Sequence, residues 1–147
     1  MSIVKRVILF LLLLFVSSQT FPQNKTDGWE EGSRYNKYFN ASKIDTVSGK
    51  ILKIEDKAPM PGMASGIELL VLSVRDTVKD TLTVQICPKW MATNLNINLK
   101  VNDEVEIEGC KAVCNGAKVF MASRLVAPGI ILQLRDEKGS PIWDRLR

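Results

Sequence analysis

The dipeptide Asn115-Gly116 constrains the fold of this chain most, because it is the strongest two-residue signal for a β-hairpin. It lies between two stretches rich in β-forming residues, 104–113 and 117–126. Similar short stretches, each bounded by turn-forming residues, occur at 46–54, 66–74, 81–87 and 130–134. The only helical turn we expect lies at 89–94. Five or six short strands with one brief insert predict an all-β fold, a small five- to six-stranded antiparallel barrel.

The register of the predicted hairpin changes phase along its first strand. Over 104–108 the odd residues are apolar and the even residues are glutamates, so the odd positions face the core. Across the Asn115-Gly116 turn, the expected pairing of Cys110 with Met121 instead turns even positions toward the core. We therefore predict a β-bulge at Gly109, where an extra residue bends the strand.

The N-terminal residues have the features of an export signal. A short basic head precedes ten unbroken apolar residues, 7–16, and small residues follow. This order is typical of a secretory signal peptide, which we assign to residues 1–20. A spanning helix needs about 20 apolar residues, so an uncleaved anchor is the less favoured alternative. We predict an exported protein, secreted or periplasmic, without a stable membrane span after processing.

Residues 21–45 are polar and irregular, and we interpret them as a flexible linker before a barrel domain at 46–147. Four aromatic residues lie in this linker: Trp29, Tyr35, Tyr38 and Phe39. They fit a short docking segment, but a loosely packed tail with isolated aromatic residues is the preferred interpretation.

Charge and the absence of histidine limit the possible functions. The 147 residues contain 20 Lys and Arg, 16 Asp and Glu, and no His. Removal of 1–20 takes away Lys5 and Arg6 but no acid, so the net charge falls from +4 to +2. Such a balance does not favour nucleic acid as a partner. Without histidine, the chain has neither a Ser-His-Asp nor a Cys-His catalytic centre, nor a metal site that needs imidazole.

The three cysteines, Cys87, Cys110 and Cys114, all lie in the part predicted to be exported, where thiols tend to oxidise. Cys110 and Cys114 are about 13 Å apart in an extended strand, too far for a disulfide unless the strand is irregular. A bridge from Cys87 to either of them stays open. We expect Cys114, beside the turn, to be exposed. The spacing matches zinc-site patterns poorly, so we predict no metal site.

The acidic residues do not indicate catalysis. Glu104, Glu106 and Glu108 repeat with the period of a strand, beside Asp103, and they form a solvated strand face more readily than an acid–base pair. No phosphate-binding loop or nucleophile motif is present. We therefore assign no catalytic residue and no cofactor, and we expect a protein that is not an enzyme.

Two segments of the predicted domain form a candidate ligand-binding surface. Its residues are Lys89, Trp90, Arg135, Asp136 and Trp143. The alternative interpretation is structural: Arg135 and Asp136 fix the last turn, and the two tryptophans fill the ends of the barrel.

The chain from about Thr46 to Asp144 resembles small exported or periplasmic bacterial OB-fold proteins, many of which have no assigned function. The resemblance rests on Val-Ser-Gly-Lys-Ile (47–51), Gly-Ile-Glu-Leu (66–69), Thr-Val-Gln-Ile-Cys-Pro-Lys-Trp (83–90), Val-Asn-Asp-Glu-Val-Glu-Ile-Glu-Gly (101–109), Asn-Gly (115–116), Met-Ala-Ser (121–123) and Leu-Arg-Asp-Glu-Lys-Gly-Ser-Pro-Ile-Trp (134–143). Cys87 stands where glycine is usual. The resemblance implies an OB fold and little about function, because one barrel serves many ligands.

We therefore expect an exported, non-enzymatic OB-fold module that binds a protein or a small ligand in the cell envelope. Binding of single-stranded nucleic acid is one alternative, and a thiol- or metal-binding protein is another. The sequence leaves the oligomeric state open.

Overall fold

The computed structural model describes residues 27–75 and 77–147. The predicted signal peptide, 1–20, lies outside the described residues. The described elements are η1 (Asn36–Tyr38), β1 (Asp45–Lys57), β2 (Gly66–Arg75), β3 (Val78–Pro88), α2 (Lys89–Asn94), β4 (Glu104–Cys114), β5 (Ala117–Ala127), β6 (Ile130–Gln133) and η2 (Ile142–Leu146).

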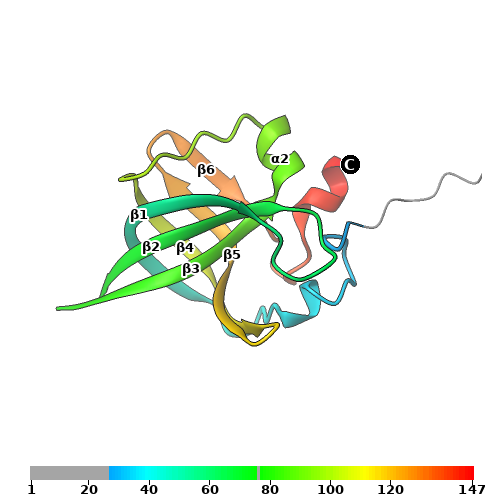
Figure 1. Ribbon diagram of the computed structural model, residues 1–147, viewed down its shortest axis with the longest axis horizontal. Helices are drawn as coiled ribbons and strands as arrows, with labels where there is room; N and C mark the ends of the chain where they lie inside the picture. The colour runs from blue at the N-terminus through cyan, green and yellow to red at the C-terminus, as the bar shows by residue number, and fades with distance from the viewer. Residues whose placement is uncertain (1–26, 76) are drawn as a thin grey trace, which may run out of the picture.

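Six strands form one strongly curved sheet in the order β3-β2-β1-β4-β5-β6 (Figure 1). Neighbouring strands in this order are antiparallel, and β3 also pairs with β5 in parallel. That parallel pairing closes five strands into a barrel, and β6 extends the sheet beyond β5. The strand order, with a short helix between β3 and β4, is that of an OB fold.

The expected fold class is confirmed, and so are the positions of the elements. The helical turn expected at 89–94 is α2, and each predicted strand overlaps an observed one. The charged residues between the predicted strands 66–74 and 81–87, which we expected to form a turn, are mostly strand, because Arg75 already pairs with Val78.

The predicted irregularity at Gly109 is present, since the register of β4 with β5 shifts between Glu108 and Gly109. The extra residue lies on the partner strand, where Ser123 is passed over between Ala122 and Arg124. A Cβ atom at Gly109 would collide with the carbonyl oxygen of Met121. Glycine therefore allows the two backbones to approach closely at the bulge.

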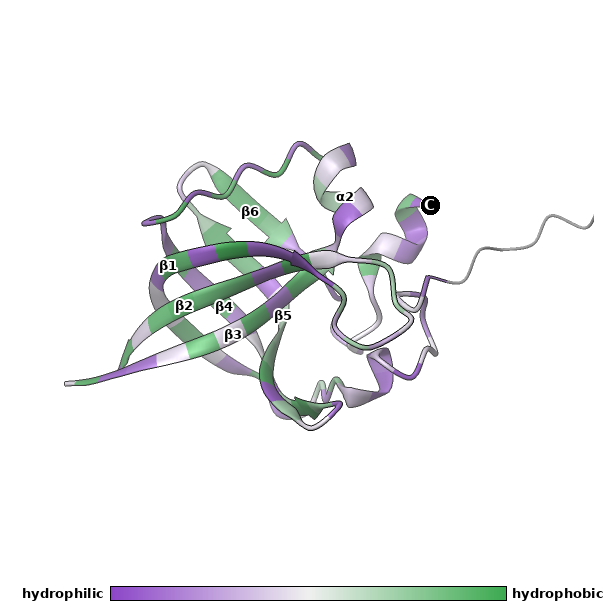
Figure 2. Ribbon diagram, viewed as in Figure 1, coloured by the Kyte–Doolittle hydropathy of each residue, from purple (hydrophilic) through white to green (hydrophobic). Residues whose placement is uncertain are grey.

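The core contains the side chains that the curved sheet encloses and those beneath the terminal segments. Ile51, Leu69, Val71, Ile107 and Leu125 are fully buried. Figure 2 shows that β2 is apolar along much of its length, whereas hydrophobic and hydrophilic residues alternate along β1. Only Gly66, Leu69 and Val71 of β2 are buried, so the apolar residues on its other face are partly exposed. The alternation along β1 is typical of a strand with one solvated face.

The expectation of a loose tail at residues 21–45 is wrong for the part that the structure describes. Trp29 and Tyr35 are buried, and the Trp29 ring lies 5.0 Å from the Tyr35 ring and 5.5 Å from the Trp143 ring. The Tyr35 hydroxyl donates a 2.9 Å hydrogen bond to Gln85 of β3. This segment therefore covers part of the barrel as an integral part of the fold.

Candidate functional site

The barrel closes over only part of its height. β3 and β5 pair at two positions, Val84 with Phe120 and Gln85 with Met121. On the side of these pairs toward the start of β3, β3 and the β4–β5 hairpin diverge and leave a groove of about 660 Å³. We call it the mouth groove; it is lined by residues 80–83, 111–113 and 118–120.

Apolar side chains are exposed at this opening. Val78 and Leu82 have the same strand parity as Val84, so they lie on the face of β3 that carries the core. Val113, which lines the groove, is 58% exposed. Val78 is 65% exposed and lines the adjoining hollow, which shares Asp80, Leu82 and Lys111 with the mouth groove. These valines remain accessible because no strand covers the gap between β3 and β5.

The edge of β3 beside the mouth groove has backbone groups free to pair. Arg75 and Val78 close a two-residue hairpin, so their backbones bond each other and the pairing direction then alternates along β3. The backbone groups of Lys79 and Thr81 therefore point away from β2, toward the groove. The Thr81 N–H donates a 2.9 Å hydrogen bond to the Asp80 carboxylate.

Positive charge predominates around the mouth groove. Lys111 and Lys118 line it, against the single acidic side chain of Asp80. The side chain of Lys79 lies on the opposite face of β3, beside Lys50 and Glu104. The side chains of Lys111, Lys118 and Asp80 form no ion pair with another residue that the structure describes. Their charges are therefore available to a partner.

Sequence reasoning did not find the mouth groove. Its residues come from the starts of β3 and β5 and from the end of β4, and none belongs to a recognisable motif. The one indication in the sequence was the presence of valine at positions 78 and 113, beside charged or turn residues. The exposed end of a strand is usually polar, so these valines indicate an apolar surface there.

The five residues predicted to bind a ligand do not form one open surface. Arg135 is 1% exposed, with its guanidinium carbon 4.5 Å from the centre of the Phe39 ring and 5.0 Å from that of Trp143. Its Nη1 donates a 3.1 Å hydrogen bond to the carbonyl of Gly139. Trp143 has no exposed surface, and its indole N–H donates a 2.7 Å bond to the carbonyl of Trp29. Both side chains serve packing.

Asp136 organises the last turn of the chain. Its carboxylate accepts hydrogen bonds from the N–H groups of Lys138 and Ser140, at 3.0 and 2.9 Å, and pairs with Arg145 at 3.1 Å. These contacts fit the structural interpretation of Arg135 and Asp136.

Lys89 and Trp90 remain accessible, at the end of the barrel where the two terminal segments meet. Lys89 pairs with Asp56. The indole of Trp90 donates a 3.1 Å bond to Asp27, and the Arg147 guanidinium lies 5.2 Å from the centre of its ring.

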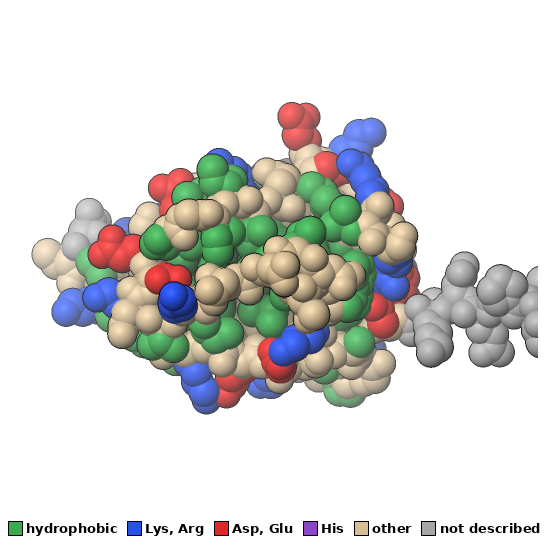
Figure 3. Space-filling model, turned by 90° about the horizontal axis from the view of Figure 1, so that it is seen from above, with side chains coloured by type: hydrophobic (Ala, Val, Ile, Leu, Met, Phe, Trp, Pro, Cys, Tyr) green, Lys and Arg blue, Asp and Glu red, His purple; other side chains and the backbone are tan. Residues whose placement is uncertain are grey.

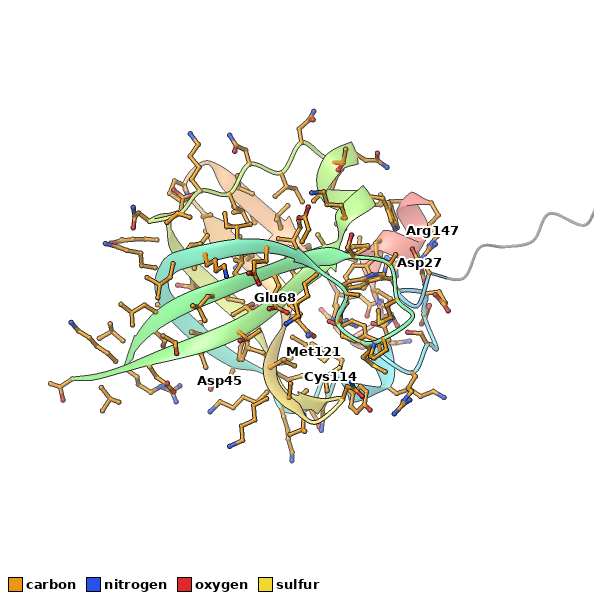
Figure 4. The ribbon with its side chains drawn as sticks, viewed as in Figure 1. Asp27, Asp45, Glu68, Cys114, Met121 and Arg147 are labelled. Atoms are coloured by element: carbon orange, nitrogen blue, oxygen red, sulfur yellow. The ribbon has the colours of Figure 1, made fainter. Side chains whose placement is uncertain are left out.

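Asp27 joins the two ends of the described chain (Figure 4). Its carboxylate accepts a 2.8 Å hydrogen bond from Arg147 and another from the N–H of Trp29. Burial alone raises the pKa of Asp27, but the hydrogen bonds from Arg147, Trp29 and Trp90 outweigh it and hold the pKa below its usual value.

We expect Asp27→Asn to lower the free energy of unfolding at pH 7 by about 1–3 kcal/mol, because the charged acceptor is lost. A lowered pKa stabilises the fold above the ordinary carboxyl pKa and ceases to do so as the pH falls through the folded value. The difference between variant and wild type should therefore shrink from pH 7 to pH 3 in urea denaturation. A difference that is equal at both pH values would contradict this role of Asp27.

All three cysteines lie among the described residues, and each is free and buried. The bridge from Cys87 that the sequence left open is not formed, and the expectation that Cys114 is exposed is wrong. Burial raises the pKa of Cys87 to about 12, although the backbone N–H of Ala92 opposes the shift. Cys110 Sγ accepts a bond from the N–H of Asn40, so it faces the segment before β1. Within residues 27–75 and 77–147, no cluster of three or more His, Cys, Asp or Glu side chains is arranged to hold a metal ion.

Apolar side chains also gather on a second face, seen from above in Figure 3, which includes α2, the loop after it and β6. The exposed large hydrophobic residues on these elements are Leu95, Val101 and Ile131. β6 is the last strand of the sheet and also has an open edge. We take the mouth groove as the candidate site because an open stretch of β3, Val113 and two lysines without an ion-pair partner among the described residues meet there.

Comparison with known proteins identifies the family. The sequence profile of the MamS/MamX magnetosome protein family matches residues 43–132, which is more than half of the chain. This chain belongs to the MamS/MamX family. The matched span runs from just before β1 into β6 and includes every residue of the mouth groove. Among the described residues, no helix combines the length and apolar character needed to cross a membrane.

One solved structure with a similar arrangement is the dimeric N-terminal domain of PriB protein from Thermoanaerobacter tencongensis. It shares 21% sequence identity with this chain at a TM-score of 0.47, and the alignment covers 58% of this chain and 96% of that one. A search of curated proteins finds no match.

Proposed function

We propose that this protein is a non-enzymatic binding module of the magnetosome apparatus, exported to the cell envelope, that holds a partner protein at its mouth groove. The family membership supports the setting, and the basic, apolar-flanked groove supports binding. The groove itself carries the proposal: it combines exposed valines, unpaired lysines and free backbone groups on one side of the barrel.

Binding at the mouth groove predicts a partner whose capture depends on two lysines. The full chain, tagged at its C-terminus and expressed in its own host, should capture an envelope protein. The variant Lys111→Glu/Lys118→Glu should capture about tenfold less of that protein, because reversed charges weaken complementary interfaces. Quantitative mass spectrometry of the captured fraction measures the ratio.

The matched control is Lys100→Glu/Lys138→Glu, which changes the charge equally at two exposed lysines outside the mouth groove. This control should capture the partner as wild type does. Equal loss in both double variants, or equal retention in both, would contradict a role for the groove.

Single-stranded nucleic acid, the alternative partner, finds less support in the mouth groove. Stacking of bases needs exposed aromatic rings, and the one aromatic residue that lines this groove, Phe120, is buried. The lysines remain compatible with phosphate, so a salt titration with a single-stranded oligonucleotide separates the two. Steeply salt-dependent binding stronger than that of the captured protein would favour nucleic acid.

A further inference from the structure

The mouth groove resembles a sheet that lacks one strand. We propose that the mouth groove binds an extended acidic segment of the partner protein, and that this segment adds as a strand to the open edge of β3. This inference rests on the proposed function. The proposal depends on three features of the groove: its backbone groups, its exposed valines and its charge.

The first feature is the backbone of β3. Lys79 and Thr81 direct their N–H and C=O groups away from β2, and the pairing of β3 with β5 begins only at Val84. A peptide in extended conformation satisfies such groups through main-chain hydrogen bonds, the recognition mode known as β-augmentation. The β4–β5 hairpin diverges from this edge, which leaves room beside it.

The second feature is the pair of exposed valines. Val113 on β4 lines the mouth groove, and Val78 on β3 lines the hollow that adjoins it; both side chains are exposed. Successive side chains of an added strand point to opposite faces of the sheet. Alternate apolar residues of the partner segment would cover these two valines, while the residues between them reach the rim.

The third feature is charge. Lys111 and Lys118 line the groove, and Asp80 is the one acid among its lining residues. A second copy of this chain bound edge to edge would bring the same lysines together, which opposes self-pairing. An acidic segment from a different chain satisfies them instead.

Asp80 tunes access to this edge. Its carboxylate accepts a hydrogen bond from the N–H of Thr81. A carbonyl of an added strand would need to accept from that same N–H. The carboxylate also repels an acidic segment. Asp80→Ala removes both obstacles and leaves the exposed surface otherwise unchanged, so this variant should bind the segment more tightly.

The test uses the full chain and three ten-residue peptides. In the first, glutamate alternates with valine and threonine; in the second, lysine replaces glutamate; the third is the first peptide with alternate backbone nitrogens methylated. We expect the acidic peptide to bind, with slower amide exchange at Lys79 and Thr81 by NMR. The lysine and methylated peptides should bind at least about tenfold more weakly, since they lose charge complementarity or main-chain bonds.

Two variants complete the test. Lys111→Glu/Lys118→Glu should weaken binding of the acidic peptide about tenfold, and Asp80→Ala should strengthen it severalfold. Binding that is unaffected by backbone methylation or by the sign of the peptide charge would overturn the proposal. So would a dissociation constant above about 1 mM for the acidic peptide. If these peptides fail while capture of the envelope protein still depends on Lys111 and Lys118, the groove binds a folded surface and the proposed function stands. Capture that is independent of both lysines removes the proposed function itself.

Discussion

Replacing Trp143 with alanine should lower the free energy of unfolding by about 3–5 kcal/mol, the range for truncating a buried aromatic side chain. The indole has no exposed surface, and it packs between Trp29 and the guanidinium of Arg135. Its N–H also donates the 2.7 Å bond to the carbonyl of Trp29. The variant therefore creates a cavity, removes a hydrogen bond and leaves the buried cation with one ring fewer.

Urea denaturation followed by circular dichroism measures this loss without relying on tryptophan fluorescence. Trp90→Ala is the matched control, because Trp90 is only partly buried and lies outside the Trp29–Trp143 pair. Its loss should be clearly smaller. If Trp143→Ala costs less than the control, the terminal segments contribute little to the stability of the barrel.

The second large effect is expected at the bulge. Gly109→Ala should destabilise the fold by about 1–3 kcal/mol or more, because overpacking at a well-packed site forces the backbone to shift. The added methyl group would meet the carbonyl oxygen of Met121 and the ring of Phe120, and backbone atoms have little freedom to move away. The hairpin β4–β5 and the β3–β5 closure both depend on that close approach.

Gly129→Ala separates this clash from ordinary glycine effects. Gly129 has a φ of +72° in the turn between β5 and β6, and a Cβ atom there would meet nothing within 4 Å. Its replacement should cost only about 1–2 kcal/mol, from the left-handed backbone alone. Equal losses at the two glycines in thermal and urea denaturation would show that the bulge tolerates a side chain.

The strands were predictable because their limits depend on local chemistry. Asn115 and Gly116 both adopt positive φ, at 50° and 80°, as a two-residue hairpin requires. The slip at Gly109 was visible because burial of alternate residues must stay in register across a hairpin. Its exact form was not, since either strand can carry the extra residue; here it is Ser123 of β5.

The terminal cluster was less predictable, because its burial depends on contacts between distant parts of the chain. Trp29 lies in a polar sequence, and its burial depends on contacts with Tyr35, with Gly66 and with Trp143, which lies 114 positions later. Arg135 belongs to a residue type that is rarely fully buried. Two aromatic rings and the Gly139 carbonyl offset part of its desolvation, while its Nε has no hydrogen-bond partner among the described residues. No local pattern in the sequence predicts that arrangement.

The mouth groove exists because β3 and β5 pair over only a short stretch, and no local sequence pattern predicts the length of that pairing. The pairing joins residues more than 30 positions apart and ends after two pairs. Its limit follows from the curvature of the whole sheet. The sequence therefore pointed to Lys89 and Trp90, which lie outside the mouth groove, and gave no indication of Lys111 and Lys118, which line it.

The hydrogen-bonded ion pair between Asp27 and Arg147 has a consequence for orientation. It brings both ends of the described chain to one pole of the barrel, while the tip of the β2–β3 hairpin lies at the opposite pole (Figure 1). Anything attached at either end, whether a tether, a fusion or a surface, approaches from that first pole. A molecule attached in this way would direct its β2–β3 hairpin, and with it the open edge of β3, away from the point of attachment.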